Sequence, residues 1–294
     1  MSSIINIKNF SKSFGNKTVI KDLSFEVKEG EVFAFLGANG SGKTTTIRAL
    51  LNIYTSDNGE LKIFGEDYTP DLSNKIGYLP EERGLYLNMT VIDTLVYFAQ
   101  LKGIKKEDAL ERSKDFLKLV GLESKEKSVI KSLSSGQQQK IQLGVSIIHD
   151  PKLLILDEPT KGLDPVNRNL LMNIIKEKNR LGKTIIFSTH IMEEAEKVAD
   201  RVLILSQGRA AEYGKLGEIK EKYNEGKILV RSEQKIDSND VYLVKETSSG
   251  YILKPKKKVK PETILKQLVK DNIKVSSFTP LLPKLDDIFI KITK

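Results

Sequence analysis

The feature that most constrains the fold of this chain is a glycine-rich loop placed between a strand-like run and a helix-like run. The loop covers residues 37–44, contains three glycines, and ends in Lys43 and Thr44. The apolar run 32–36 precedes it and the run 45–51, with helix-forming character, follows it. A strand, a glycine loop and a helix in this order are typical of phosphate-binding sites. The sequence therefore predicts one here.

Each residue type in the loop suits an anionic ligand. Glycines let the backbone curl so that successive N–H groups converge on phosphate oxygens, and the helix N-terminus favours the same anion. Lys43 adds a cation for the terminal phosphates, and the Thr44 hydroxyl is placed to hold Mg²⁺. The alternative is a glycine-rich turn without a ligand. The candidate nucleotide-binding residues of the loop are Gly37, Ala38, Asn39, Gly40, Ser41, Gly42, Lys43, Thr44 and Thr45.

Composition narrows the class of protein. The chain has 294 residues, of which 39% are hydrophobic and 30% charged, enough for one large and one small domain. No window approaches 18 consecutive apolar residues, so we expect an intracellular protein that does not itself cross a bilayer. There are no cysteines and only two histidines, which leaves Mg²⁺ with nucleotide as the expected metal chemistry.

The net charge of +9 is compatible with nucleic acid, with anionic lipid or with a lysine-rich solvated surface. Lysines are scattered along the whole chain except for the run 254–260, which we interpret as a solvated turn between elements. Charge alone therefore leaves the partner open.

Hydrophobic patterning predicts an α/β protein. Apolar runs at 32–36, 153–156, 184–187 and 202–205 are typical of strands buried on both faces of a largely parallel sheet. Alternating runs at 4–9 and 23–27 predict an antiparallel sheet near the N-terminus.

A helical pattern then occupies residues 82–135 and predicts an inserted helical subdomain. Thr90 and Asp93 resemble a capping box that opens a helix over 91–101. A second helix is predicted to end at Gly121, with its buried stripe made of Leu110, Phe116, Leu117 and Val120.

The strong signals stop near Tyr213, so we divide the chain into a nucleotide-binding domain at 1–215 and a small α/β accessory domain at 216–294. In the latter, short strands are expected at 227–231, 241–244 and 251–253, and a helix at 261–272. The predicted buried face of that helix consists of Ile264, Leu265, Leu268 and Val269.

Two adjacent carboxylates end the strand at 153–156. Asp157 can hold Mg²⁺ through water, while Glu158, pointing the other way by strand alternation, can polarise or deprotonate an attacking water. The alternative is that Asp-Glu-Pro merely terminates a strand.

The sequence Leu133-Ser134-Ser135-Gly136-Gln137-Gln138, about 20 residues before that strand, brings the motifs together. With them it resembles the nucleotide-binding subunit of an ABC transporter, whose signature is Leu-Ser-Gly-Gly-Gln. This chain has Ser135 where the first glycine is usual, but Ser134 and Gly136 are retained. The resemblance implies that Ser134, Ser135, Gly136 and Gln137 contact ATP held by an opposite ATP-binding subunit, in a head-to-tail homodimer or heterodimer around two Mg-ATP.

Further positions match the family in order. Phe14 stands where an aromatic ring stacks on adenine, although an isolated aromatic in a strand is more often core. Asp164, in Gly162-Leu163-Asp164-Pro165, resembles the loop through which the two subunits communicate. His190 matches the histidine that contacts the γ-phosphate, although a lone histidine is more often structural. Glu81 replaces the usual glutamine and is a further candidate ligand of metal or water.

The resemblance implies an ATP hydrolase with Glu158, His190 and Lys43 as catalytic residues and with ATP and Mg²⁺ as cofactors. The segment Pro80-Glu81-Glu82-Arg83-Gly84-Leu85-Tyr86 is similar to that of an exporter branch that includes sodium, drug and peptide efflux systems. Such a subunit drives integral membrane permease subunits from the cytoplasmic face of the membrane. No nucleic acid partner is expected.

Two rival functions stay open. One is a soluble ABC ATPase acting on nucleic acid, ribosomes or metal-cluster assembly, which the positive charge would suit. Against it stand the single set of motifs and the lack of a long coiled-coil pattern. The other is a nucleotide sensor without turnover. The sequence does not indicate the transported substrate, because the translocation path belongs to another polypeptide.

Overall fold

The chain folds into two compact units, 1–215 and 216–294, which we describe separately. The structure is a computed structural model, and it describes residues 2–82, 84–256 and 259–293. No helix in these ranges is long and apolar enough to cross a lipid bilayer.

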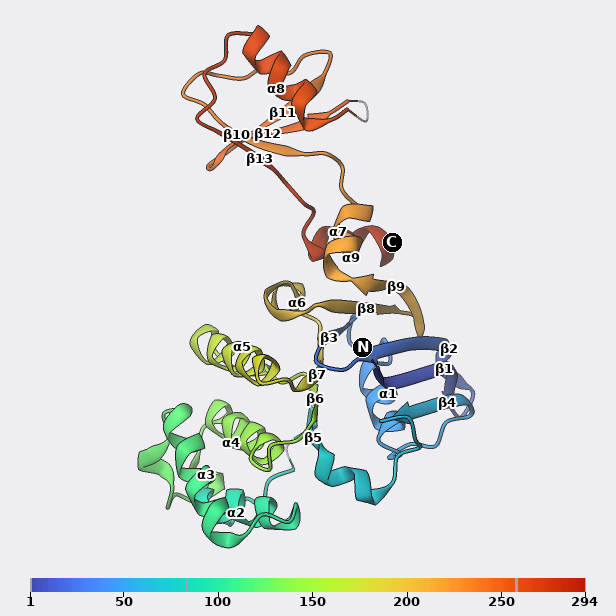
Figure 1. The fold of residues 1–294 in the computed structure, drawn as a ribbon, viewed down its shortest axis with the longest axis vertical. Coiled ribbons are helices and arrows are strands. Elements are labelled where there is room, and N and C mark those ends of the chain that lie inside the picture. The colour runs from blue at the N-terminus through green and yellow to red at the C-terminus, as the bar shows by residue number, and fades with distance from the viewer. Residues whose placement is uncertain (1, 83, 257–258, 294) are drawn as a thin grey trace. The chain divides into compact units, whose positions relative to one another are not determined.

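The first unit combines a mainly parallel sheet with an antiparallel one (Figure 1). Its strands are β1 (Ser3–Phe14), β2 (Lys17–Lys28), β3 (Val32–Leu36), β4 (Asn58–Ile63), β5 (Ile76–Leu79), β6 (Leu153–Asp157), β7 (Thr184–Thr189), β8 (Arg201–Ser206) and β9 (Arg209–Lys215). Its α-helices are α1 (Lys43–Leu50), α2 (Val91–Leu101), α3 (Lys106–Leu119), α4 (Ser135–Ile147), α5 (Pro165–Arg180) and α6 (Met192–Val198). Short 3₁₀ turns cover Pro70–Lys75, Glu123–Lys125 and Ile130–Ser132.

The larger sheet has the strand order β5-β6-β7-β3-β8-β9 within the described residues. Neighbouring strands from β5 to β8 run parallel, and β9 joins β8 antiparallel. Because β6, β3 and β7 are adjacent and parallel, the segments that follow them emerge at one edge of the sheet. The phosphate loop, Glu158 and His190 follow these three strands, so the topology gathers them.

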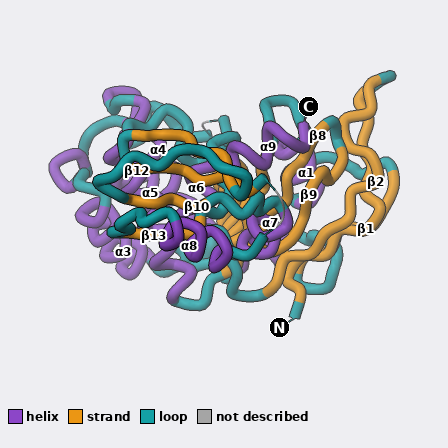
Figure 2. Tube along the Cα trace, turned by 90° about the horizontal axis from the view of Figure 1, so that it is seen from above, coloured by secondary structure: helices purple, strands orange, loops and turns teal. Residues whose placement is uncertain are grey.

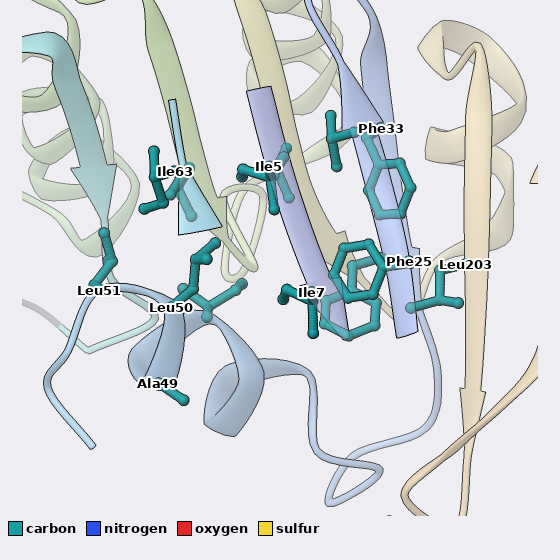
Figure 3. Packing of buried hydrophobic residues seen from close by; sticks show 14 of the residues in the cluster. Ile5, Ile7, Phe25, Phe33, Ala49, Leu50, Leu51, Ile63 and Leu203 are labelled. Carbon is teal, nitrogen blue, oxygen red and sulfur yellow. The ribbon is translucent and has the colours of Figure 1, made fainter. Parts of the chain in front are cut away.

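The antiparallel sheet β2-β1-β4 lies with α1 on one face of the larger sheet, while α4, α5 and α6 lie on the other (Figure 1). A continuous apolar core fills the space between the two sheets (Figure 3). Phe25 of β2 stacks on Phe33 of β3 with 5.4 Å between ring centroids. Ile5 and Ile7 of β1 are also essentially buried in this core. Packing of this kind fixes the position of β3, and therefore of the loop that follows it.

The second unit is a small antiparallel sheet with a helix packed on it. Its strand order is β11-β12-β10-β13, and Figure 2 shows β12, β10 and β13 side by side. Ile228, Leu253, Ile264 and Leu268 belong to its separate core. Its elements are α7 (Leu216–Lys222), β10 (Ile228–Arg231), β11 (Tyr242–Thr247), β12 (Gly250–Pro255), α8 (Pro261–Lys270), β13 (Ser277–Pro280) and α9 (Leu285–Thr293).

The predicted α/β class is confirmed, with its mainly parallel sheet, N-terminal antiparallel sheet, helical insertion and small α/β appendage. Four predicted burial positions are corrected or confirmed by the helices. Leu110 of α3 is 39% exposed, because Ala109 and Ser113 occupy the buried stripe that was assigned to it. On α8, Leu265 and Val269 are exposed, since only one narrow face of this short helix meets the sheet.

Two smaller predictions concern the helical insertion and the lysine run. Thr90 caps α2 as expected, since its side chain accepts the backbone N–H of Asp93. Lys254 lies in β12 and not in a turn, while Lys257 and Lys258 fall outside the described residues. Sequence patterning also missed β13 and α9.

Candidate active site

The phosphate loop joins β3 to α1, and its glycines are required by close packing. Gly42 caps α1 with φ of 110°, in the left-handed region, and a Cβ there would collide with the Ile20 side chain. A Cβ on Gly37 would lie 2.6 Å from the backbone oxygen of Leu205. Gly40 has φ of 76° but faces open space. Backbone conformation and close packing therefore both select glycine at this bend.

Lys43 is buried at the start of α1, and its ammonium is held by oxygen atoms. Its Nζ donates to the backbone oxygen of Gly37 at 2.9 Å and to that of Ala38 at 3.4 Å. It also forms an ion pair with Oε1 of Glu158 at 3.3 Å, and both side chains are only 6% exposed. The loop and the strand end after β6 are thus joined through one cation.

Glu158 lies between Lys43 and His190. Nδ1 of His190, at the end of β7, is 2.9 Å from Oε2 of Glu158, and since a carboxylate only accepts, the ring nitrogen donates. The Glu158 backbone has φ of 48°, so the residue has left the strand. The prediction that strand alternation orients Glu158 is therefore wrong. Its direction is set by this turn and by its N–H, which donates to Oγ of Ser188 at 2.9 Å.

Asp157, the last residue of β6, is fully buried. Its Oδ1 accepts the Ser188 hydroxyl, while its Oδ2 has no hydrogen-bond partner in the part of the chain that the structure describes. Burial raises the pKa of Asp157, and hydrogen bonds from Ser188 and Thr44 oppose that rise. A buried carboxylate oxygen without a donor is an expected ligand for a cation, so Asp157 and the neighbouring Thr44 fit Mg²⁺.

The fit is to a metal shared with substrate and not to a preformed protein cage. Within the described ranges, no group of three or more acidic or histidine side chains is arranged to hold a metal ion. Mg²⁺ commonly takes only one or two protein ligands and completes its coordination with water and phosphate oxygens.

Glu81 follows β5 and reaches the same place. Its Oε2 is 3.5 Å from the Thr44 hydroxyl, which donates, and its Oε1 pairs with Nζ of Lys161 at 2.7 Å. The Lys161 contact holds the pKa of Glu81 below its usual value. Lys161 was not predicted as a site residue. Its position three residues after Glu158 was the available signal.

A cavity of about 630 Å³ adjoins these residues, within the range of roughly 300–1,000 Å³ found for ligand sites. Phe14, Lys43, Thr44, Glu81 and Glu158 line it, together with the backbone of the loop. Phe14 is 45% exposed at this cavity, so its alternative interpretation as a core residue does not hold. Its ring meets Tyr54 edge-on, with 5.2 Å between centroids.

The signature residues lie elsewhere. Ser134 caps α4, and its side chain accepts the Gln137 N–H at 3.3 Å while the Gln137 side chain accepts the Ser134 N–H at 2.9 Å. None of residues 134–137 belongs to the lining of the cavity, as far as the described residues define it. Asp164 caps α5 by accepting the Asn167 N–H at 2.9 Å. The structure therefore leaves both segments outside the cavity of the same chain.

Sequence reasoning also missed two polar residues that support the site. Ser188 bridges Asp157 and Glu158, as described above. Gln142 of α4 is buried, and its Nε2 donates to the backbone oxygens of Pro80 at 3.1 Å and of Glu82 at 3.0 Å. Neither residue belongs to a motif, so single-sequence reasoning offered no signal for either. Arg83 of the same segment lies outside the described residues.

Comparison with known proteins gives consistent matches. A family model described as "ABC transporter" matches residues 20–161, and one described as "ATP-binding protein DrrA1-3-like, C-terminal domain" matches 214–293. An uncharacterised ABC transporter ATP-binding protein of Methanocaldococcus jannaschii is 48% identical over 74% of this chain and 80% of its own length. The bacitracin transport ATP-binding protein of Bacillus licheniformis is 33% identical over 99% of this chain and 98% of its own. A solved structure of an ATP-binding subunit of an ABC transporter superposes with a TM-score of 0.69, at 29% identity, over 75% of this chain and 93% of that one.

Proposed function

Because this chain belongs to the ABC transporter family as an ATP-binding subunit, we propose that it hydrolyses Mg-ATP as the motor of an exporter. Two copies, or one copy and a related subunit, close around two nucleotides and drive separate transmembrane permease subunits. The observation that carries the proposal is the row Lys43, Glu158 and His190 beside the phosphate loop, with Asp157 behind it.

Binding is assigned to the cavity at the loop. Backbone N–H groups of residues 37–45 and the α1 N-terminus face the phosphates, while Lys43 supplies the cation. Phe14 offers an exposed ring for the adenine. Thr44 and Asp157, with Glu81 nearby, hold Mg²⁺, which neutralises charge on the phosphates when bound.

Hydrolysis is assigned to Glu158 as the group that accepts a proton from water. Its Oε2 is fixed by His190 and its Oε1 by Lys43, so the carboxylate is oriented before substrate arrives. His190 is nearly half exposed, at 46% for its side chain, and can therefore also reach a phosphate. Most of the rate enhancement in phosphoryl transfer comes from such positioning and charge stabilisation.

The dimer follows from what the cavity of one chain omits. Ser134 and Gly136 lie at the N-terminus of α4, an end that suits phosphate, yet they do not line the described cavity. We assign them to the nucleotide of the opposite subunit, and Asp164 to the contact between subunits. An isolated monomer then binds ATP but hydrolyses it slowly.

The permease is assigned to a surface formed by the helical insertion. A cavity of about 270 Å³ there is lined by Leu51, Ile53, Phe98 and other residues of α2 and α4. Tyr86 and Tyr97 lie beside it, exposed and with 5.8 Å between their ring centroids. Exposed apolar groups gathered around a groove are typical of a protein-binding surface. A permease segment docked here places the subunit at the cytoplasmic face of the membrane.

The transport partner can be tested directly. The chain is expressed together with the membrane protein encoded beside its gene and purified from detergent-solubilised membranes. Recovery of a polytopic membrane protein, with Mg²⁺-dependent phosphate release by the complex, supports the proposal. Recovery of ribosomes or nucleic acid instead would favour the soluble ATPase, which the charge of +9 also suits. Nucleotide binding without phosphate release by the complex would favour the sensor.

A further inference from the structure

Glu81 brings a third carboxylate to a site that must accept a polyphosphate. Asp157 and Glu158 are the other two, and both are buried. The negative charge of Glu81 contributes to the raised pKa of Asp157, which shows that these carboxylates influence one another. An added carboxylate here repels ATP unless a cation compensates it.

Lys161 is the cation in contact with Glu81. Its Nζ lies 2.7 Å from Oε1 of Glu81, while the second oxygen, Oε2, accepts the Thr44 hydroxyl at 3.5 Å. The ammonium therefore occupies one carboxylate oxygen and leaves the other toward the residue that we assign to Mg²⁺. The Glu81 side chain is 32% exposed, so the pair stands at the mouth of the site and not in its interior.

Both partners of this pair have anchored backbones. The Lys161 N–H donates to the Glu158 backbone oxygen at 3.1 Å, which ties Lys161 to the turn that carries the proposed base. The backbone on either side of Glu81 is held by Gln142, whose amide binds the oxygens of Pro80 and Glu82. The ion pair thus connects two fixed segments, one after β5 and one after β6.

The local charge depends on this pair. Glu81, Asp157 and Glu158 against Lys43 and Lys161 leave one formal negative charge at the site. Loss of Lys161 alone would leave two, and a glutamine at 81 would leave none. Replacing both members of the pair by neutral residues returns the formal charge to that of the unaltered chain.

On the basis of the function proposed above, we propose that Lys161 is a positioning residue that neutralises Glu81 and thereby allows a carboxylate at this position of an ATP site. Exposed ion pairs contribute little to folding stability, and the Lys161 side chain is 60% exposed. The contribution of Lys161 therefore lies in nucleotide affinity and in the orientation of Glu81.

The test compares Lys161→Met, Glu81→Gln and the double variant by equilibrium binding of a fluorescent ATP analogue with Mg²⁺. Lys161→Met is expected to weaken binding by about tenfold, or about 1.4 kcal/mol, and Glu81→Gln to strengthen it. The double variant is expected to bind within about threefold of the unaltered chain. Unfolding midpoints are expected to stay together, because the effect is on nucleotide and not on folding.

Lys62→Met is the matched control, because Lys62 forms an exposed ion pair with Asp67 at 3.0 Å on β4, away from the cavity. It is expected to leave the affinity unchanged. A double variant as weak as Lys161→Met would overturn the proposal, since Lys161 would then act on the nucleotide directly. Equal affinities for all variants would also overturn it. Failure of the unaltered chain to bind ATP would instead refute the proposed function.

Discussion

Replacing Ser188 by alanine is expected to destabilise the first unit by about 2–4 kcal/mol. The Ser188 hydroxyl is fully buried, donates to the carboxylate of Asp157 and accepts the N–H of Glu158 at 2.9 Å. A hydrogen bond to a charged group contributes about 1.5–3 kcal/mol and one to a neutral group about 0.5–1.5 kcal/mol. The substitution removes both bonds and leaves two buried groups without this partner.

The matched control is Ser113→Ala. Ser113 is also fully buried, but its hydroxyl donates only to the Ala109 backbone oxygen in the preceding turn of α3. Alanine is the better helix former, so this change is expected to cost less than about 1 kcal/mol. Urea unfolding followed by far-ultraviolet circular dichroism measures both variants. A Ser188→Ala loss within about 0.5 kcal/mol of the control would refute the reasoning.

The pH dependence of the Ser188→Ala effect has a defined sign. Burial already raises the pKa of Asp157 above its usual value of 3.8, and the hydroxyl opposes that rise by favouring the carboxylate. Without the hydroxyl the pKa rises further, so the ionised form costs more in the folded state. The penalty is therefore present at neutral pH and decreases as pH falls through the folded-state pKa. A penalty that grew on acidification would contradict this assignment.

Three further changes test the site and its surroundings. Glu158→Gln is expected to lower ATP hydrolysis by about 10²–10⁴-fold and to trap an ATP-bound dimer, seen by size measurement with ATP and Mg²⁺; a monomer under these conditions would count against it. Phe14→Ala is expected to weaken ATP binding by about 0.5–1.5 kcal/mol in a binding titration while leaving the unfolding midpoint nearly unchanged, because the ring is 45% exposed. Burial lowers the pKa of His149 to about 4, so the folded state loses stability as pH falls from 6.5 toward 4. His149→Gln is expected to flatten that part of the stability profile, and an unchanged slope would show that His149 is not its source.

The central sheet of the first unit was predictable because its strands are short, apolar and unbroken. Runs such as Val32–Leu36 and Leu153–Asp157 are buried along their whole length, which single-sequence patterning detects well. The edges were less predictable. Leu110 shows why, since an apolar residue on an amphipathic helix can lie just outside the buried stripe. The strand Ser277–Pro280 gave no signal because its exposed positions carry no apolar alternation.

The candidate site divided along similar lines. The loop, Asp157 and Glu158 carry their chemistry in local motifs, so their proximity followed from a parallel sheet. Lys161, Ser188 and Gln142 act through contacts between segments distant in sequence or through geometry after a strand end. No spacing rule identifies such partners, and only the folded chain reveals them.

The hydrogen bonds of Gln142 have a mechanical consequence. Gln142 lies seven residues beyond the first residue of α4, or about 10 Å along the helix axis. A 10° swing of α4 about its first turn would move this amide by roughly 2 Å, more than a hydrogen bond can stretch without breaking. The helix that starts at the signature serine and the strand exit carrying Glu81 must therefore travel as one lever, or uncouple abruptly.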